Sequence, residues 1–358
     1  MRKPLIVVTG VDPAAMDCAM VSLAWDLPRA VTVRHRIDPE SQVLTRTVSD
    51  ATGVLEQEQI PLEHACVSCA LREDIVPTLE RLGRDDRWSN VVAGLPNATE
   101  AGQLAHILGQ QSRLARHLKL SSVVCAVGTD HIIRDLLSDD LLRERGLHTN
   151  PGDDRGVGEV ACAQIEFADV VVMDGDPGRE GTDLVRALAR PDVMFVPGAS
   201  ELDAASLAVR RHQQSLTRAW CSPESDIDLP PLGESHAWRL DLSSSRPFHP
   251  ERLLDQIGRL GTGAHRSRGR FWVPTRPGAV LEWAGAGGQL SIGSHSSRGR
   301  RTPTTRLIFT GVGSTPTGLV GAFEDLLLAP TEVARNQSSW DVLEDGLEPW
   351  LGDIRDVA

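Results

Sequence analysis

Short, almost continuously apolar runs alternate with segments of helical periodicity over the first 220 residues. The apolar runs predict strands over Leu5–Thr9, Ala30–Arg36, Val43–Val48, Asn90–Leu95, Ser121–Val127, Asp169–Asp174 and Asp192–Val196. The periodic segments predict helices over Ala14–Trp25, Arg72–Leu82, Ala101–Leu118, Ile132–Arg145, Gly158–Phe167 and Gly181–Ala189. Strands that are apolar on both faces are typical of sheets covered by helices, so residues 1–220 are predicted to form an α/β domain with a doubly wound, mostly parallel sheet.

The composition changes after this domain. Residues 221–235 are rich in Pro, Ser and Asp, which is typical of a linker. Residues 236–330 predict a small α+β domain. Its expected elements are strands over His236–Leu242, Gly269–Pro274, Ala279–Trp283, Gln289–Ile292 and Arg306–Thr310 and helices over His249–Leu260 and Thr317–Leu328. Residues 331–358 form an acidic tail.

The chain has 358 residues, a formal net charge of −12 and an apolar fraction of 41%. No stretch approaches the roughly 20 apolar residues that a membrane span requires, and the apolar run after MRKP is too short for a signal peptide. A cytoplasmic protein with no membrane partner is therefore expected. The six cysteines include one closely spaced pair, so a disulfide framework is not expected.

Charge is distributed unevenly along the chain. Residues 236–330 contain 12 arginines against six acidic residues, whereas the rest of the chain is acidic. Arg266, Arg268 and Arg270 alternate, so on a strand they would share one face, and residues 297–301 (SRGRR) predict a basic loop. Two interpretations stay open: a surface for phosphate backbones, RNA rather than DNA, or a solvated sheet face.

The sequence LIVVTGVDPAAMDC lies where a strand would lead into a phosphate-binding loop. Such loops use backbone N–H groups, a Lys that reaches the phosphates and a Ser or Thr that binds Mg²⁺. Counting from Gly10, the second Gly, the Lys and the hydroxyl residue are replaced by Ala15, Met16 and Asp17. GTP is therefore not expected as a cofactor, and no catalytic residue is assigned.

Cys66 and Cys69 form a Cys-x-x-Cys pair just before a predicted helix. This spacing lets two sulfurs reach one metal ion, and thiolates suit zinc or copper(I). A nearby helix N-terminus would lower the thiol pKa. Tetrahedral zinc needs further ligands, for which His64, Glu63 and Asp74 are the nearby candidates, and the spacing does not select among them. A redox pair and a purely structural loop are the other interpretations.

Several segments in order resemble the CobW-type metallochaperone GTPases: the phosphate-loop position, ACVSCALREDI, AQIEFADVVVMDGD, SSRPFHPERLLDQI with RSRGRFWV, and LIFTGVGSTPTGLVGAFEDLLLAPTE. The resemblance covers nearly the whole chain. It implies a P-loop-NTPase-like domain followed by a CobW C-terminal-type domain. In that family's Gly-Cys-x-Cys-Cys motif, Cys66 and Cys69 match the outer cysteines, Ala65 replaces the Gly and Ser68 the middle Cys.

EHACVSCALRED and HRIDPESQVLTRTV are further similar to a degenerate branch of this family, the mycobacterial-type ribosome hibernation factor recruitment proteins. That resemblance implies a non-catalytic, zinc-responsive adaptor that recruits a hibernation-promoting factor to the small ribosomal subunit under zinc limitation. Cys66, Cys69 and His64 would then hold zinc, and Arg266, Arg268 and Arg270 would face the ribosome. The alternatives are a GTP-dependent zinc metallochaperone and a plain zinc store.

Overall fold

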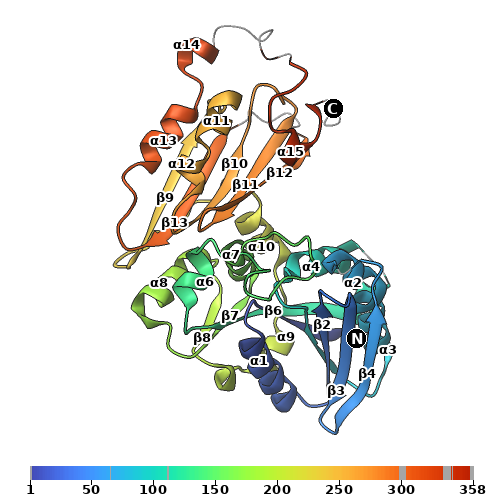
Figure 1. The fold of residues 1–358 in the computed structure, drawn as a ribbon. Helices are drawn as coiled ribbons and strands as arrows, with labels where there is room; N and C mark the ends of the chain where they lie inside the picture. The colour runs from blue at the N-terminus through green and yellow to red at the C-terminus, as the bar shows by residue number, and fades with distance from the viewer. Residues whose placement is uncertain are drawn as a thin grey trace.

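The computed structural model describes residues 2–64, 66–110, 113–297, 304–333, 340 and 342–354, without the side chains of 295–297 and 333. Two sheets organise the chain (Figure 1). The predicted basic loop at residues 297–301 lies outside the described residues except for the backbone of Ser297. No helix in the described ranges is long and apolar enough to cross a membrane.

The first sheet has eight strands in the order β4-β3-β2-β5-β1-β6-β7-β8. Their bounds in that order are Gly53–Pro61, Val43–Asp50, Ala30–Asp38, Asn90–Gly94, Lys3–Thr9, Leu118–Gly128, Val170–Asp174 and Met194–Val196. Strands β2 to β8 pair in parallel through β5, β1, β6 and β7, and only β3 and β4 add an antiparallel edge. The predicted α/β class with a mostly parallel sheet is confirmed.

Helices cover both faces of this sheet. The helices are α1 (Pro13–Asp26), α2 (Val67–Ala70), α3 (Val76–Arg84), α4 (Ala101–Gln110), α5 (Leu114–His117), α6 (Ile132–Leu137), α7 (Val157–Phe167), α8 (Gly178–Leu188), α9 (Ala204–Val209) and α10 (Gln214–Cys221), with a π-helix at Leu71–Ile75 and a 3-10 turn at Ala199–Glu201. Alternate residues of the central strands explain the two layers: Ile6 and Val8 pack with α1 and α9, whereas Leu5 and Val7 pack with α3 and α4.

The structure departs from the sequence predictions at a strand and at a helix of the first domain. Strand β4 was not predicted because most of its side chains are exposed and its apolar positions do not alternate. The predicted helix over Ile132–Arg145 ends at Leu137. The turn at Gly287 and Gly288 in the second domain packs on the residues that follow Leu137, and a Cβ on Gly287 would overlap the Ser138 carbonyl. The second domain therefore shapes the chain at this point.

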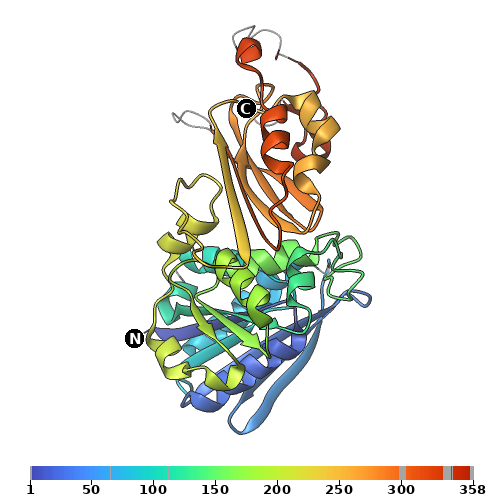
Figure 2. The ribbon, with the colours of Figure 1, turned by 90° about the vertical axis from the view of Figure 1, so that its left-hand side faces the viewer.

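The second sheet is antiparallel, in the order β12-β11-β10-β13-β9. Its strands in that order are Gln289–Ser297, Ala279–Ala286, His265–Phe271, Thr305–Val312 and Ala237–Ser244, and its helices are α11 (Pro250–Gln256), α12 (Gly258–Gly261), α13 (Leu319–Leu326), α14 (Pro330–Val333) and α15 (Glu348–Leu351). Figure 2 shows α11, α12 and α13 on one side of this sheet. Phe271, Phe309 and Phe323 belong to the core between the sheet and these helices, so the predicted α+β domain is confirmed.

The connecting and terminal segments are packed rather than free. Within residues 222–236, the carbonyl of Pro223 accepts a hydrogen bond from Arg270 at 2.8 Å. In the acidic tail, Asp345 forms a buried ion pair with Arg276 at 2.9 Å, and Leu347 is fully buried. The described part of the tail therefore belongs to the second domain.

Candidate functional site

The phosphate-loop position contains a very short loop. Strand β1 ends at Thr9 and helix α1 begins at Pro13, so only Gly10, Val11 and Asp12 connect them. Oδ1 of Asp12 accepts hydrogen bonds from the backbone N–H groups of Ala14 at 2.8 Å and Ala15 at 3.1 Å. These are the amide groups with which a helix N-terminus would bind a phosphate. A carboxylate of the protein itself therefore holds the anion-binding position.

The Asp12 carboxylate also fits closely against the neighbouring strand. A Cβ on Gly128, at the carboxyl end of β6, would overlap the Asp12 side chain. Asp12 followed by Pro13 is a helix-start signature, because Asp is a favoured N-cap and Pro is favoured in the first turn. Sequence reasoning overlooked Asp12, although this local signal was available.

The two residues that replace the Lys and the hydroxyl group have structural roles. Met16 is 2% exposed and belongs to the core between α1 and the sheet. Asp17 forms ion pairs with Arg34 and Arg36 on β2, the second at 3.0 Å. Burial and the neighbouring Arg36 lower the pKa of Arg34 to about 10, so the guanidinium group of Arg34 stays charged at neutral pH. Neither Met16 nor Asp17 is available to hold phosphate or Mg²⁺.

In nucleotide-binding proteins of the GTPase type, an Asn-Lys-x-Asp motif after a later strand binds the guanine base. In this chain the corresponding loop follows β7, and its matching residue has a structural contact instead. Asp176, the residue that matches the last position of an Asn-Lys-x-Asp motif, accepts a hydrogen bond from the backbone of Gly178 at 2.9 Å. The contact closes the turn that leads into α8. Asp176 is thus a turn residue in this structure.

The cysteine pair lies at the start of a second helix. Cys66 is the N-cap of α2, and its Sγ accepts a hydrogen bond from the backbone N–H of Cys69 at 3.1 Å. Cys69 therefore lies in the first turn of the helix, which begins five residues earlier than predicted. The hydrogen bond with the Cys66 thiol, together with burial, raises the pKa of Cys69. For Cys69 this corrects the expected pKa lowering, because its thiol is buried and adjacent to the Cys66 thiol.

The helix that follows the pair has a π-turn with an identifiable cause. Residues Leu71–Ile75 form a π-helix between α2 and α3. Pro77 has no backbone N–H and its ring would clash with the carbonyl four residues earlier, so a wider turn relieves the helix there. The π-turn places Asp74 in the interior, where it contacts His35 Nε2 at 3.0 Å and also pairs with Arg46.

These contacts decide which nearby groups can join the thiols. Asp74 is only 5% exposed and is committed to His35 and Arg46; burial raises its pKa, but these two partners lower it overall, so it stays ionised. His64 is exposed. Among the described residues, no three His, Cys, Asp or Glu side chains are grouped so that they could hold a metal ion. The structure thus brings Cys66 and Cys69 together but does not bring His64 to them as a third ligand.

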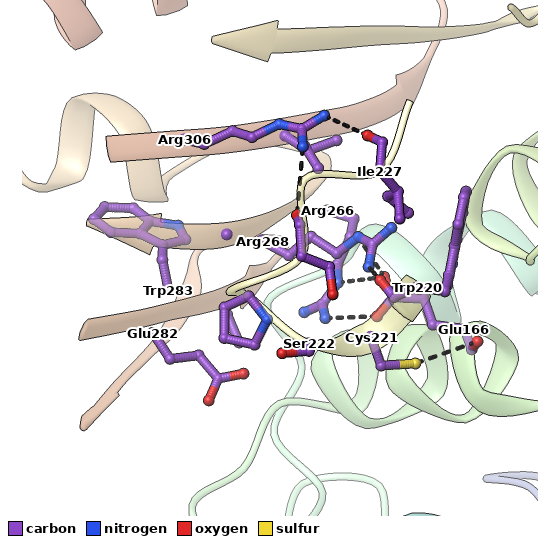
Figure 3. Close-up of a pocket in the computed structure, with 15 residues that line it drawn as sticks. Glu166, Trp220, Cys221, Ser222, Ile227, Arg266, Arg268, Glu282, Trp283 and Arg306 are labelled. Atoms are coloured by element: carbon purple, nitrogen blue, oxygen red, sulfur yellow. Dashed lines mark hydrogen bonds and ion pairs between the residues drawn. The ribbon is translucent and has the colours of Figure 1, made fainter. Parts of the chain in front are cut away.

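Arg266, Arg268 and Arg270 share one face of β10, as their alternation predicts. This face meets the first domain, as Figure 3 shows for Arg266 and Arg268 beside Glu166 and Trp220. Nε and Nη2 of Arg266 each donate to Glu166 of α7 at 3.0 Å, and both side chains are 5% exposed. Arg268 lies 3.6 Å from the same carboxylate, and its guanidinium stacks 4.9 Å from the ring centre of Trp220. Arg270 pairs with Asp226 of the connecting segment.

The expectation that these three arginines face the ribosome is therefore corrected. As whole residues, Arg266 and Arg270 are only 4% and 7% exposed, and Arg268 is half-buried. Burial by itself raises the pKa of Glu166, but the guanidinium groups of Arg266 and Arg268 lower it overall, and the same pairing raises the pKa of Arg266. The physical reason is that a buried carboxylate requires cationic partners, and the sheet face supplies them. A cavity of about 40 Å³ beside them leaves room for little more than ordered water.

Comparisons with known proteins agree with this architecture. Residues 238–327 match the family model of the cobalamin synthesis protein cobW C-terminal domain. A zinc chaperone of Mycobacterium tuberculosis is 26% identical over 394 residues, which cover 99% of this chain and 94% of that protein. The zinc-regulated GTPase metalloprotein activator 1 of Dictyostelium discoideum is 20% identical over 267 residues, which cover 70% of this chain and 56% of that protein.

Among solved structures, the zinc(II)-bound YjiA GTPase of E. coli aligns with 91% of this chain and 99% of its own, at 13% identity and a TM-score of 0.34. The similarity to the Mycobacterium tuberculosis protein includes residues 238–327 and extends over nearly the whole chain. Residues 238–327 thus match the cobW C-terminal domain, and nearly the whole chain is similar to a protein named a zinc chaperone.

Proposed function

We propose that this protein is a non-catalytic, zinc-responsive adaptor of the cytoplasm that recruits a hibernation-promoting factor to the small ribosomal subunit under zinc limitation. The observation that carries the non-catalytic part is the capped helix: Asp12 occupies the amide groups of α1 that would bind phosphate. The buried Met16 and the ion-paired Asp17 support the same conclusion. A nucleotide would have to displace one carboxylate and gain no lysine in return.

Zinc is proposed as the ion to which the adaptor responds. Cys66 and Cys69 supply two adjacent sulfurs, and a relative 26% identical to this chain is named a zinc chaperone. Two thiolates fill half of a tetrahedral zinc site. Two thiolates alone would leave the other positions of a bound zinc ion open to exchangeable ligands. Such exchange suits a sensor or a carrier better than a zinc store.

The ribosomal partner is proposed from the resemblance of EHACVSCALRED to the hibernation-factor recruitment branch. The experiment is co-sedimentation of the purified protein with small ribosomal subunits and the hibernation-promoting factor, with and without a zinc chelator. We expect the factor to sediment with the subunit only when this protein is present and zinc is removed. Equal sedimentation in both conditions, or none in either, would refute the proposal.

Matched cysteine variants test the role of the thiol pair. Cys66→Ser and Cys69→Ser should each abolish the response to zinc, because one thiolate is lost from a pair that already provides only half of a site. Cys18→Ser is the control, since Cys18 is an exposed thiol on α1 outside this pair. A response that survives both single variants would exclude Cys66 and Cys69 as the zinc-sensing groups.

A GTP-dependent zinc metallochaperone is the second proposal, because a relative 20% identical to this chain is named a zinc-regulated GTPase metalloprotein activator. Calorimetric titration with GTP and Mg²⁺ separates the two functions. The adaptor predicts no heat of binding and no release of phosphate. Saturable GTP binding with magnesium-dependent hydrolysis would overturn the adaptor and favour the metallochaperone.

A further inference from the structure

A groove of about 730 Å³ lies on the first domain at the amino ends of β1 and β6. It runs between α4, α5 and the segment that leads into α10. Four lining residues are cationic, and none is acidic: Arg2, Lys119, Arg210 and Arg211. This basic groove belongs to a chain with a net charge of −12, and it lies at the opposite ends of β1 and β6 from the capped helix α1.

The positive charge in the basic groove is not neutralised by neighbouring carboxylates. Within the described residues, Arg2, Lys119 and Arg211 form no ion pair, and Arg210 donates only to the backbone carbonyl of Asp192, at 3.3 Å. Arg113, just before α5, is exposed and equally without an acidic partner in the described part of the chain. Unpaired cations that gather on one surface attract polyanions.

The backbone that presents these cations is fixed. The N–H of His212 donates to the carbonyl of Leu120 on β6 at 3.3 Å, and Nδ1 of His212 contacts Asp169 at 2.8 Å. Asp169 is buried and also pairs with Arg190 at 2.9 Å, so its charge is balanced away from the groove. Arg210 and Arg211 directly precede His212 and are therefore held at the groove by the core of the domain.

The lining indicates the chemistry of the ligand. Guanidinium and ammonium groups bind phosphate oxygens, and apart from the imidazole of His212 no aromatic ring lines the groove to stack on a base. Several cations along one groove suit a polymer rather than a single anion. We propose that the basic groove binds the phosphate backbone of folded RNA. The choice of RNA rests on the proposed ribosomal function, whereas the choice of phosphate rests on the groove.

The test is fluorescence anisotropy with a short labelled RNA duplex over about 50 to 200 mM salt, the range in which phosphate contacts are strongly screened. Arg211→Glu should weaken binding at least about eightfold at 0.1 M salt and flatten the slope of log K against log salt by about 0.9, the values for one lost phosphate contact. Arg179→Glu is the matched control, because this substitution changes the charge by the same amount at an exposed residue of α8 that does not line the groove.

Each outcome bears on the proposal. Equal affinity of wild type and Arg211→Glu, or equal weakening by Arg179→Glu, would overturn the groove as the binding surface. Displacement of the RNA by millimolar inorganic phosphate would overturn the polymeric ligand, and equal affinity for duplex DNA would overturn the choice of RNA. If RNA binding depends on Arg211 but wild-type protein fails to sediment with the ribosomal subunit, the basic groove stands and the proposed adaptor function fails.

Discussion

Removal of the Glu166 carboxylate is the sharpest test of how the two domains are joined. Glu166→Gln keeps the size of the side chain but leaves the buried Arg266 without its two charged hydrogen bonds, both 3.0 Å long, and Arg268 without its nearest carboxylate. Breaking a buried ion pair from one side typically costs about 3–5 kcal/mol. A Coulomb estimate at an effective dielectric of about 20 gives about 4 kcal/mol for charges about 4 Å apart, which agrees.

The assay is urea unfolding followed by tryptophan fluorescence, which reports on both domains because Trp220 precedes the connecting segment and Trp238 and Trp283 lie in the second domain. Glu166→Gln and Arg266→Met should each lower the free energy of unfolding by about 3–5 kcal/mol. The double variant should cost about 1–3 kcal/mol less than the sum, because the second change removes a group that the first has already left unpaired.

Arg81→Met provides the matched control. Arg81 makes the same bidentate contact, with Glu56 at 2.7 and 2.6 Å, but its side chain is 46% exposed. An exposed pair contributes at most about 1 kcal/mol, so this variant should unfold nearly as the wild type does. If Glu166→Gln also costs less than about 1 kcal/mol, or if the two interface changes are additive, Arg266 is not bound as described, and the reasoning from burial fails.

Three further predictions concern the capped helix α1, the buried ion pair of the tail and the pH dependence of the Glu166 contacts. Met16→Lys combined with Asp17→Thr restores the Lys and the hydroxyl residue of the phosphate loop, although Ala15 still replaces its second Gly. This variant should not bind GTP in a calorimetric titration, because Asp12 still caps α1; measurable binding would show that the missing Lys and hydroxyl residue explain the loss. Arg276→Met should lower stability by about 3–5 kcal/mol and expose the tail to proteolysis, because it leaves Asp345 buried and unpaired; unchanged proteolysis would place the tail elsewhere. The stability difference between wild type and Glu166→Gln should be full at neutral pH and shrink as the pH falls below the ordinary glutamate value of 4.5, because the folded protein holds the pKa of Glu166 lower; a difference that grows in acid would contradict this sign.

Much of the candidate site could be predicted locally. The spacing of Cys66 and Cys69 and the missing Lys at Met16 are properties of neighbouring residues. The structure places the two cysteines together at the start of α2 and buries Met16, and their proposed roles in zinc response and in the loss of nucleotide binding remain predictions. The sequence could not predict whether the three arginines on β10 are exposed to solvent or buried against the other domain. Alternation correctly placed them on one face, but whether a sheet face meets water or another domain depends on a carboxylate 100 residues away.

The sequence by itself determined the alternation of most strands and helices in the first domain, the parallel class of its sheet and the α+β class of the second domain, because burial imprints a period of two or 3.6 on nearby residues. Only the tertiary structure decided what each charge meets. It turned Arg266 inward to Glu166, paired Asp17 with Arg36, and assembled a basic groove from Arg2, Lys119 and Arg211. The physical reason is that a charge carries no periodic signal: its partner is selected by which surfaces come into contact when the chain folds.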